Sequence, residues 1–301
     1  MSPQKRATIV ASSVALLLVL VKFMIGVASG SVAVLASAID SLLDMIISVF
    51  NFFAIKKSEE KATDRFQYGK GKVQAIAAVI EGTVITLSGL YIIYEAIKKA
   101  INGGETTLVN PAIMVMIFSI GVTFLPVEYL MLVAKQTDNI VIKSDALHYK
   151  TDLLTNGVIL FSLVIVSLTG WDMVDAIFGF GIGIYIIYSA YGIIKEGVYI
   201  LLDHALDVEI VNQIESKIDE HPLVNSYHWL KTRTDGSNNY VEFHLVLEPN
   251  MTLLEAHRIS DQIEERIMQL DERKVWIITP HYDPYDDEEI NNINVDGHQE
   301  G

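Results

Sequence analysis

The chain contains no cysteine in its 301 residues, which excludes disulfide bonds and thiolate metal sites. Any bound metal must be held by nitrogen and oxygen ligands, an argument against Cu(I) that leaves zinc, iron, manganese, cobalt and cadmium. The sequence also lacks a nucleophile elbow, a phosphate-binding loop and a His-Glu-x-x-His motif. Known catalytic motifs therefore give no support to an enzyme.

Basic residues are scarce in the C-terminal third. Residues 1–202 contain fifteen acidic and fifteen basic side chains, so the other 22 acidic and 7 basic residues, and the whole net charge of −15, lie in residues 203–301. Phosphate contacts need a basic patch, and this surface argues against nucleic acid as a partner. It favours a domain that concentrates cations.

Apolar residues make up 51% of the chain, and the mean hydropathy is +0.35. This composition indicates a membrane domain followed by a soluble one. Six segments are long and apolar enough to span a bilayer, which takes about 20 residues each. They are residues 7–29, 32–55, 73–97, 111–134, 147–169 and 174–195. The first apolar run has no small-residue cleavage site, so we interpret it as an uncleaved transmembrane helix.

Positive charge predicts the orientation of these spans. The loop between the second and third spans carries six basic residues, and Lys5 and Arg6 precede the first span. Basic loops stay in the cytoplasm, so both termini are expected there. Short loops are typical of a bacterial inner membrane protein.

Two of the spans each carry a pair of possible metal ligands one helical turn apart. Asp40 and Asp44 lie in the second, and His148 and Asp152 in the fifth. A spacing of four residues places both members of a pair on one helix face, where we expect them to be buried. Three carboxylates and an imidazole suffice for a tetrahedral divalent-metal site. Because charge inside a bilayer is costly, such groups indicate a transport site.

Interhelical hydrogen bonding is the alternative interpretation of these pairs. Other polar residues within the spans have no assigned role. Lys22 is expected to extend its ammonium to the membrane surface, and Glu81 and Glu128 are candidates for a proton or metal path. Alternating Gly179, Gly181 and Gly183 favour close helix packing.

After Leu202 the chain changes character. Helical spacing over residues 207–220 is followed by two strands, 224–234 and 240–248, joined by a turn at Asp235-Gly236. An amphipathic helix over 253–270 and a strand over 274–281 complete a small α+β domain over residues 203–284. Residues 285–301 are acidic and polar, and we expect a disordered tail.

Histidines recur on the elements of this domain. His228 and His244 lie in the first and second strands, His257 flanks the amphipathic helix, and His281 and Asp283 end the last strand on one side. Each alone is an ordinary surface residue, but together they indicate a metal site. His204, His221 and His298 lack such company and are expected to be solvated.

Together, the six spans, Asp-x3-Asp, His-x3-Asp and the α+β domain resemble the cation diffusion facilitator family, in its zinc and ferrous-iron efflux branch. The resemblance extends to about residue 285. It is carried by stretches such as Ser144-Asp-Ala-Leu-His148-Tyr-Lys-Thr-Asp152 and Tyr68-Gly69-Lys70-Gly71-Lys72.

This resemblance implies a homodimer that exchanges cytosolic Zn²⁺, or Fe²⁺, Cd²⁺ or Mn²⁺, for protons, with a ferredoxin-like α-β-β-α-β cytosolic domain. It places the transport site on Asp40, Asp44, His148 and Asp152. It places a binuclear site on His228, His244, His257, His281 and Asp283. A lysine–aspartate contact that locks the dimer near the membrane would fall on Lys72 and Asp203.

One position departs from the branch. A loop histidine that can bind a third metal is replaced by Lys70, so we expect that loop site to be absent or very weak. A metal-sensing membrane scaffold with incidental transport, and a Mn²⁺- or Fe²⁺-selective carrier, remain open at this point.

Overall fold

A computed structural model describes residues 1–30, 32–102, 110–169, 171 and 173–286. The chain divides into two compact units, Met1–Val198 and Tyr199–Gly301. Residues 287–301 of the expected tail, with His298, lie outside the described residues.

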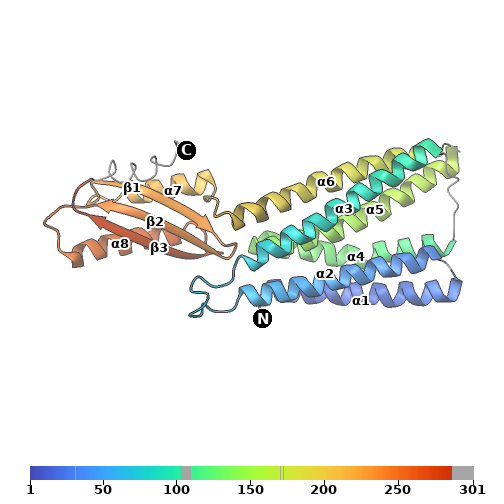
Figure 1. Cartoon of the computed structure of the whole chain (residues 1–301), viewed down its shortest axis with the longest axis horizontal. Coiled ribbons are helices and arrows are strands. Elements are labelled where there is room, and N and C mark those ends of the chain that lie inside the picture. The colour runs from blue at the N-terminus through green and yellow to red at the C-terminus, as the bar shows by residue number, and fades with distance from the viewer. Residues whose placement is uncertain (31, 103–109, 170, 172, 287–301) are drawn as a thin grey trace. The chain divides into compact units, whose positions relative to one another are not determined.

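Six helices make up the first unit, and among the described residues all six are long and apolar enough to cross a membrane, as expected (Figure 1). Their bounds are α1 Pro3–Ser29, α2 Val32–Ser58, α3 Val73–Asn102, α4 Asn110–Thr137, α5 Ile140–Thr169 and α6 Met173–Leu201. Helix α1 packs on α2 and α4, and α5 packs on α4 and α3.

The helices extend beyond the expected spans, most of them at their last residues. Helices α1 and α5 also begin earlier, where the polar side chains of Ser2 and Asn139 accept hydrogen bonds from the first backbone N–H groups. Helix α5 starts seven residues before the expected position. There the side chain of Asn139 accepts hydrogen bonds from the backbone N–H groups of Val141 and Ile142, at 3.1 and 3.2 Å.

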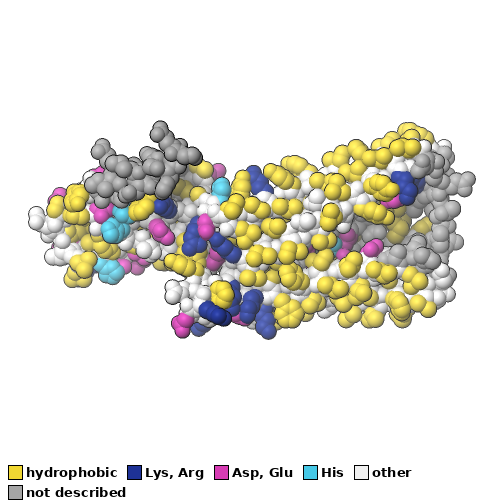
Figure 2. Space-filling view, in the orientation of Figure 1, with side chains coloured by type: hydrophobic (Ala, Val, Ile, Leu, Met, Phe, Trp, Pro, Cys, Tyr) yellow, Lys and Arg dark blue, Asp and Glu magenta, His cyan; other side chains and the backbone are white. Residues whose placement is uncertain are grey.

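Apolar side chains cover the outside of this unit. Figure 2 shows hydrophobic residues along the visible face of the helices, with most Lys and Arg side chains gathered at the end that carries the N-terminus. Leu125 and Tyr188, for example, are more than 70% exposed, whereas Ser48, Asn51 and Asp145 are fully buried. Polar groups inside and apolar groups outside are the arrangement that a lipid environment requires.

Glycines bring α3 and α6 into close contact. A Cβ atom at Gly183 of α6 would lie 2.6 Å from Ile93 Cγ1 and 3.0 Å from the Gly89 carbonyl oxygen of α3. A Cβ atom at Gly181 would meet no described atom within 4 Å. The expectation of close packing therefore holds for Gly183 and for Gly179, where a Cβ atom would lie 3.3 Å from Ala96 Cβ of α3, and not for Gly181.

The second unit has the expected order of elements: α7 Val208–Asp219, β1 Ser226–Thr234, β2 Asn238–Val246, α8 Leu253–Met268 and β3 Val275–Asp283. The sheet order is β1-β2-β3, with β1 antiparallel and β3 parallel to β2. The side chain of Asp235 holds the predicted hairpin turn by accepting hydrogen bonds from the backbone N–H groups of Ser237 and Asn238.

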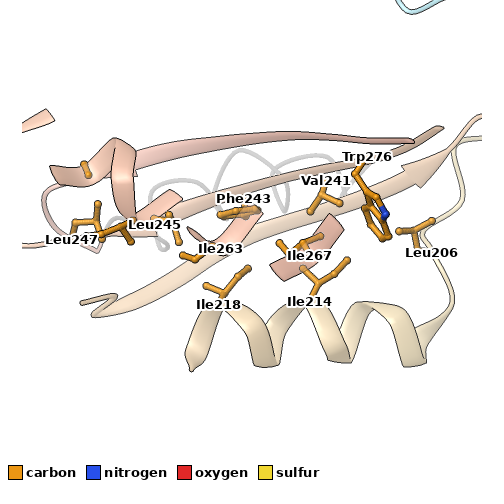
Figure 3. Packing of buried hydrophobic residues seen from close by; sticks show 12 residues of the cluster. Leu206, Ile214, Ile218, Val241, Phe243, Leu245, Leu247, Ile263, Ile267 and Trp276 are labelled. Atoms are coloured by element: carbon orange, nitrogen blue, oxygen red, sulfur yellow. The ribbon is translucent and has the colours of Figure 1, made fainter. Parts of the chain in front are cut away.

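Helices α7 and α8 cover one face of this sheet (Figure 3). Ile214 and Ile218 of α7 and Ile263 of α8 pack against Val241 and Phe243 of β2. Because side chains alternate along a strand, His244 lies on the opposite face, which the helices leave uncovered. The core thus fixes which side chains of β2 are available for binding.

His221 is not solvated, contrary to the expectation. It follows α7, is 4% exposed, and its Nε2 lies 3.2 Å from Gln262 Oε1 of α8. The backbone N–H of Leu223 donates to its Nδ1 at 3.4 Å. The histidine closes the turn after α7 against α8, a role that composition alone does not reveal.

The contact between α3 and α6 can be tested with two glycines of α6. We expect Gly183→Val to lower stability by about 1–3 kcal/mol, the range for overpacking, because its side chain would collide with Ile93 and the α3 backbone. Gly181→Val is the matched control, and thermal unfolding in detergent is the measurement. Equal melting temperatures for the two variants would contradict the close contact.

Candidate metal centres

Helices α2 and α5 bring three of the four predicted transport ligands together. One ligand atom each of Asp44, His148 and Asp152 lies within 4.8 Å of the others. The Nε2 atom of His148 is 2.9 Å from Asp44 Oδ1 and 3.8 Å from Asp152 Oδ2. His148 is 7% exposed, and the two carboxylates are partly exposed.

Asp40 lies outside this cluster of described residues, and it is exposed where a buried pair was expected. His148 is at the level of Asp44 on α2. A one-turn offset alone does not separate two ligands, since Asp152 lies one turn from His148 and its Oδ2 is 3.8 Å from His148 Nε2. The spacing of four residues therefore predicts a shared helix face, but not whether both residues reach the same cluster.

A buried polar network lies next to the cluster. Tyr149 donates its hydroxyl hydrogen to the Ala11 carbonyl oxygen at 3.1 Å, and its oxygen is 3.0 Å from Ser48 Oγ. Ser48 is 3.4 Å from Asp145 Oδ1. These contacts connect α1, α2 and α5 immediately beside His148.

Glu81 of α3 joins the same region. It is buried, and Asn51 of α2 donates to its Oε2 at 3.0 Å. Sequence analysis assigned no role to Asp145 or Asn51. The signal was present, since Asp44, Ser48 and Asn51 form a polar stripe on α2, and Asp145, His148 and Asp152 form one on α5.

In the second unit, three strands bring histidines to one rung of the sheet. His228 pairs with His244 across β1 and β2, and His244 pairs with His281 across β2 and β3. Asp283 connects them. Its Oδ2 lies 2.8 Å from His244 Nδ1 and 3.4 Å from His228 Nε2, and its Oδ1 lies 3.3 Å from His281 Nε2. The nitrogen and oxygen donors of His228, His244 and Asp283 fit a metal ion, since their ligand atoms lie within 4.8 Å of one another.

A bulge in β1 shapes this cluster. The pairing register shifts between His228 and Lys231, and Trp229 between them has a left-handed backbone, with φ of 55°. The Trp229 ring packs edge-on against His244, with centroids 4.9 Å apart. Bulges re-aim side chains at binding sites, and neither this bulge nor the register was readable from the sequence.

His257 is not brought into this cluster. The buried residues of α8 are Ala256, Ile259, Ser260, Ile263 and Ile267. His257 is 63% exposed on the outer surface of the helix, where its Nε2 is 3.8 Å from Asp261 Oδ2. Because α8 covers the face of the sheet opposite His244, the fold separates His257 from the other ligands within one chain.

Asp286 is a nearby residue that sequence analysis missed. Its Oδ1 lies 3.7 Å from His228 Nδ1, and its Oδ2 accepts a 3.1 Å hydrogen bond from Ser226. It is therefore positioned beside the ring nitrogen of His228 that faces away from Asp283. A carboxylate at the second nitrogen is a common way to orient a metal-binding histidine.

Lys70, at the loop position where the resemblance implies a histidine, is engaged in an ion pair. Its Nζ lies 2.8 Å from Glu60 Oε2, and Lys57 binds the other oxygen of Glu60 at 2.9 Å. Hydrogen bonds from Lys57 and Lys70 lower the pKa of Glu60 to about 2.

Asp203, the predicted partner of Lys72 in the dimer contact, lies in the second unit, where its Oδ1 is 3.2 Å from Arg233 Nη1.

Comparison with known proteins agrees with these features. Residues 8–202 match the family model of the cation efflux transmembrane domain, and residues 206–285 match that of the cation efflux protein cytoplasmic domain. The chain is 34% identical over 264 residues to the cation-efflux pump FieF of Escherichia coli strains K12 / DH10B, O157:H7 EC4115 and O9:H4 HS, a region that covers 88% of this chain and 88% of each relative.

The chain belongs to the cation efflux family. It is a transmembrane transporter for the efflux of divalent metal cations, and it has a cytoplasmic dimerisation domain. This confirms the resemblance to the cation diffusion facilitator family drawn from the motifs, and the family is one of transporters, in keeping with the lack of catalytic motifs.

The buried network beside His148 predicts a stability effect. We expect Tyr149→Phe to lower the free energy of unfolding by about 1–3 kcal/mol, because it leaves Ser48 and the Ala11 carbonyl without a buried partner hydroxyl. Thermal unfolding in detergent measures this. Tyr188→Phe, at a tyrosine that is 77% exposed, is the control and should have little effect. A stable Tyr149→Phe variant would contradict the network.

Proposed function

We propose that the protein exports zinc from the cytosol in exchange for protons, and that Asp40, Asp44, His148 and Asp152 bind the transported ion. The cluster of Asp44, His148 and Asp152 is the observation that carries this proposal. Two carboxylates and an imidazole leave room for a fourth ligand in a tetrahedral site, and Asp40 precedes Asp44 by one turn. This donor set suits Zn²⁺, with Cd²⁺ next; Fe²⁺ and Mn²⁺ selectivity are the competing candidates.

Proton exchange follows from the chemistry of the ligands. Carboxylates and imidazole bind either a proton or a metal at the same atoms, so metal binding releases protons. The Nε2 atom of His148 is hydrogen-bonded to Asp44 Oδ1, and a bound ion would take the place of that hydrogen. Facing the cytosol, the deprotonated ligands capture metal. Facing the other side, protons displace it, and the protonated site returns.

The orientation rests on the basic residues at one end of the helical unit (Figure 2). Lys56, Lys57 and Lys61 near the end of α2 favour a cytoplasmic location for the α2–α3 loop and for both termini. The relatives are E. coli proteins, which supports placement in a bacterial inner membrane.

For the soluble domain we propose a regulatory metal site in a homodimer, held by His228, His244, His281 and Asp283 and joined by His257. Because His257 lies apart from the others in one chain, it would contribute only through the second subunit. Asp286 would orient His228. Metal bound there would strengthen the association of the two subunits. Because such coupling is reciprocal, dimerisation would raise the affinity of the site for metal by the same factor. The Lys72–Asp203 contact that locks the dimer is proposed from the resemblance alone.

The transport site predicts a clear loss of function. In proteoliposomes with an imposed pH gradient, wild type should accumulate zinc, and Asp44→Ala should reduce flux to background, because the central carboxylate is lost. Glu95→Ala, at an acidic residue elsewhere in the helical unit, should transport normally. The same assay with Fe²⁺, Mn²⁺ and Cd²⁺ ranks the metals. Absence of flux from folded wild-type dimer would favour the sensor or scaffold.

Removing the shared carboxylate of the soluble site should separate regulation from transport. We expect Asp283→Ala to weaken metal-dependent dimerisation by roughly tenfold or more while part of the transport activity remains. Sedimentation with and without zinc measures dimerisation, and Glu272→Ala, an exposed acid of the same domain, is the control. An unchanged zinc response would exclude Asp283 as a ligand.

A further inference from the structure

Lys22 of α1 is buried in the helical unit. The residue is 8% exposed, contrary to the expectation that its ammonium extends to the membrane surface. Its Nζ donates a 2.7 Å hydrogen bond to Ser41 Oγ of α2 and lies 3.5 Å from the Ser37 carbonyl oxygen. The ammonium is therefore directed at the segment of α2 that carries the transport carboxylates.

The charges that act on this ammonium are those of the transport ligands. Ser41 is adjacent to Asp40 in sequence, and the carboxylates that interact electrostatically with Lys22 are Asp44, Asp152 and Asp40. A buried cation inside a membrane domain is costly unless it is paired. Here the negative charges that act on Lys22 are the carboxylates of the binding site, while its hydrogen bonds go to Ser41 and Ser37.

The net charge of the transport site indicates the role of Lys22. With the three ligand carboxylates counted as ionised, His148 and the neighbouring buried Glu81 and Asp145 counted as neutral, and Lys22 counted as positive, the empty site carries a net charge of −2. A divalent cation brings this set of groups to neutrality. Without the lysine the empty site would carry −3 and the loaded site −1, and uncompensated charge is strongly unfavourable in a medium of low dielectric constant.

We propose that Lys22 is a fixed counter-ion of the transport site, which matches the site to a divalent cation and weakens metal binding enough to permit release. This inference rests on the proposed transport site. An ammonium has three donors and no acceptor, so Lys22 cannot itself be a ligand. It acts by repelling the bound ion and by balancing the carboxylates when the site is empty.

The competing explanation is structural: in it, Lys22 serves only to join α1 to α2 through its hydrogen bond to Ser41. Two variants separate the explanations. Lys22→Met removes the charge and keeps a long side chain, and Ser41→Ala removes the hydrogen bond and keeps the charge. A structural role makes the two variants alike, whereas a role in charge balance makes them differ.

The test is zinc binding by the full-length dimer in detergent, together with zinc flux in proteoliposomes. We expect Lys22→Met to bind zinc more tightly, on the order of tenfold, and to transport it more slowly, because release becomes limiting. Lys22→Arg and Ser41→Ala should remain close to wild type. Loss of folding would not produce tighter binding, so the expected direction cannot arise from a damaged protein.

The outcomes are distinguishable from a failure of the proposed function. Zinc binding that is lost in Asp44→Ala defines the share that belongs to the helical site. If Asp44→Ala loses none, the proposed function fails. If Asp44→Ala loses binding but Lys22→Met binds zinc equally or more weakly, only the counter-ion inference is overturned. Lys22→Gln replaces Lys22→Met if the latter does not fold, and the same criteria apply.

Discussion

The interaction between His148 and Asp44 is the contact on which the helical unit depends, because both groups must be satisfied where water is scarce. In hydrocarbon every polar group needs a partner from the protein. Here the partners come from neighbouring helices: Asp44 from α2 meets His148 from α5, and Asn51 meets Glu81 of α3. The polar residues therefore determine which helix faces meet, and the apolar residues are left to cover the outside.

Close packing of small residues also holds the helices together, in addition to the polar core. Hydrophobic attraction between helices is weak in lipid, so small residues that let backbones approach become important. The α3–α6 pair uses this device, with Gly89 and Gly183 opposite one another. Helix α5 contacts its neighbours through polar side chains instead, among them Asn139 bonded to Gln74 of α3 and Lys143 bonded to Glu196 of α6.

The two candidate metal centres bring similar donor atoms together on different secondary structure, helices in the membrane unit and a β-sheet in the soluble domain. In the membrane unit, ligands on one helix are four residues apart, and a second helix completes the set. In the soluble domain, each strand contributes one histidine to a rung, and Asp283 bridges them. The helical arrangement leaves the ligand set dependent on how two helices meet. The sheet fixes three strands by backbone hydrogen bonds, so its donors are held more rigidly, which suits a site that retains its metal rather than one that must release it.

These differences explain how much could be predicted from sequence. Period and polarity predicted the six helices, the α-β-β-α-β order and the faces of Asp44, His148 and Asp152, because those are local properties of the chain. Whether Asp40 reaches the cluster with Asp44 depends on contacts among several helices, which leave no local signal in the sequence.

The parallel register of β2 and β3, which places His244 beside His281, was likewise unreadable, since the strands are joined through α8. Among the expectations that the structure contradicts, the one for Lys22 is the most informative. A lone lysine in an apolar run looks like a residue at the membrane surface until the acidic segment of α2 is placed opposite it. The proposed role of Lys22 depends on the net charge of side chains from several helices. These side chains come together only in the folded site.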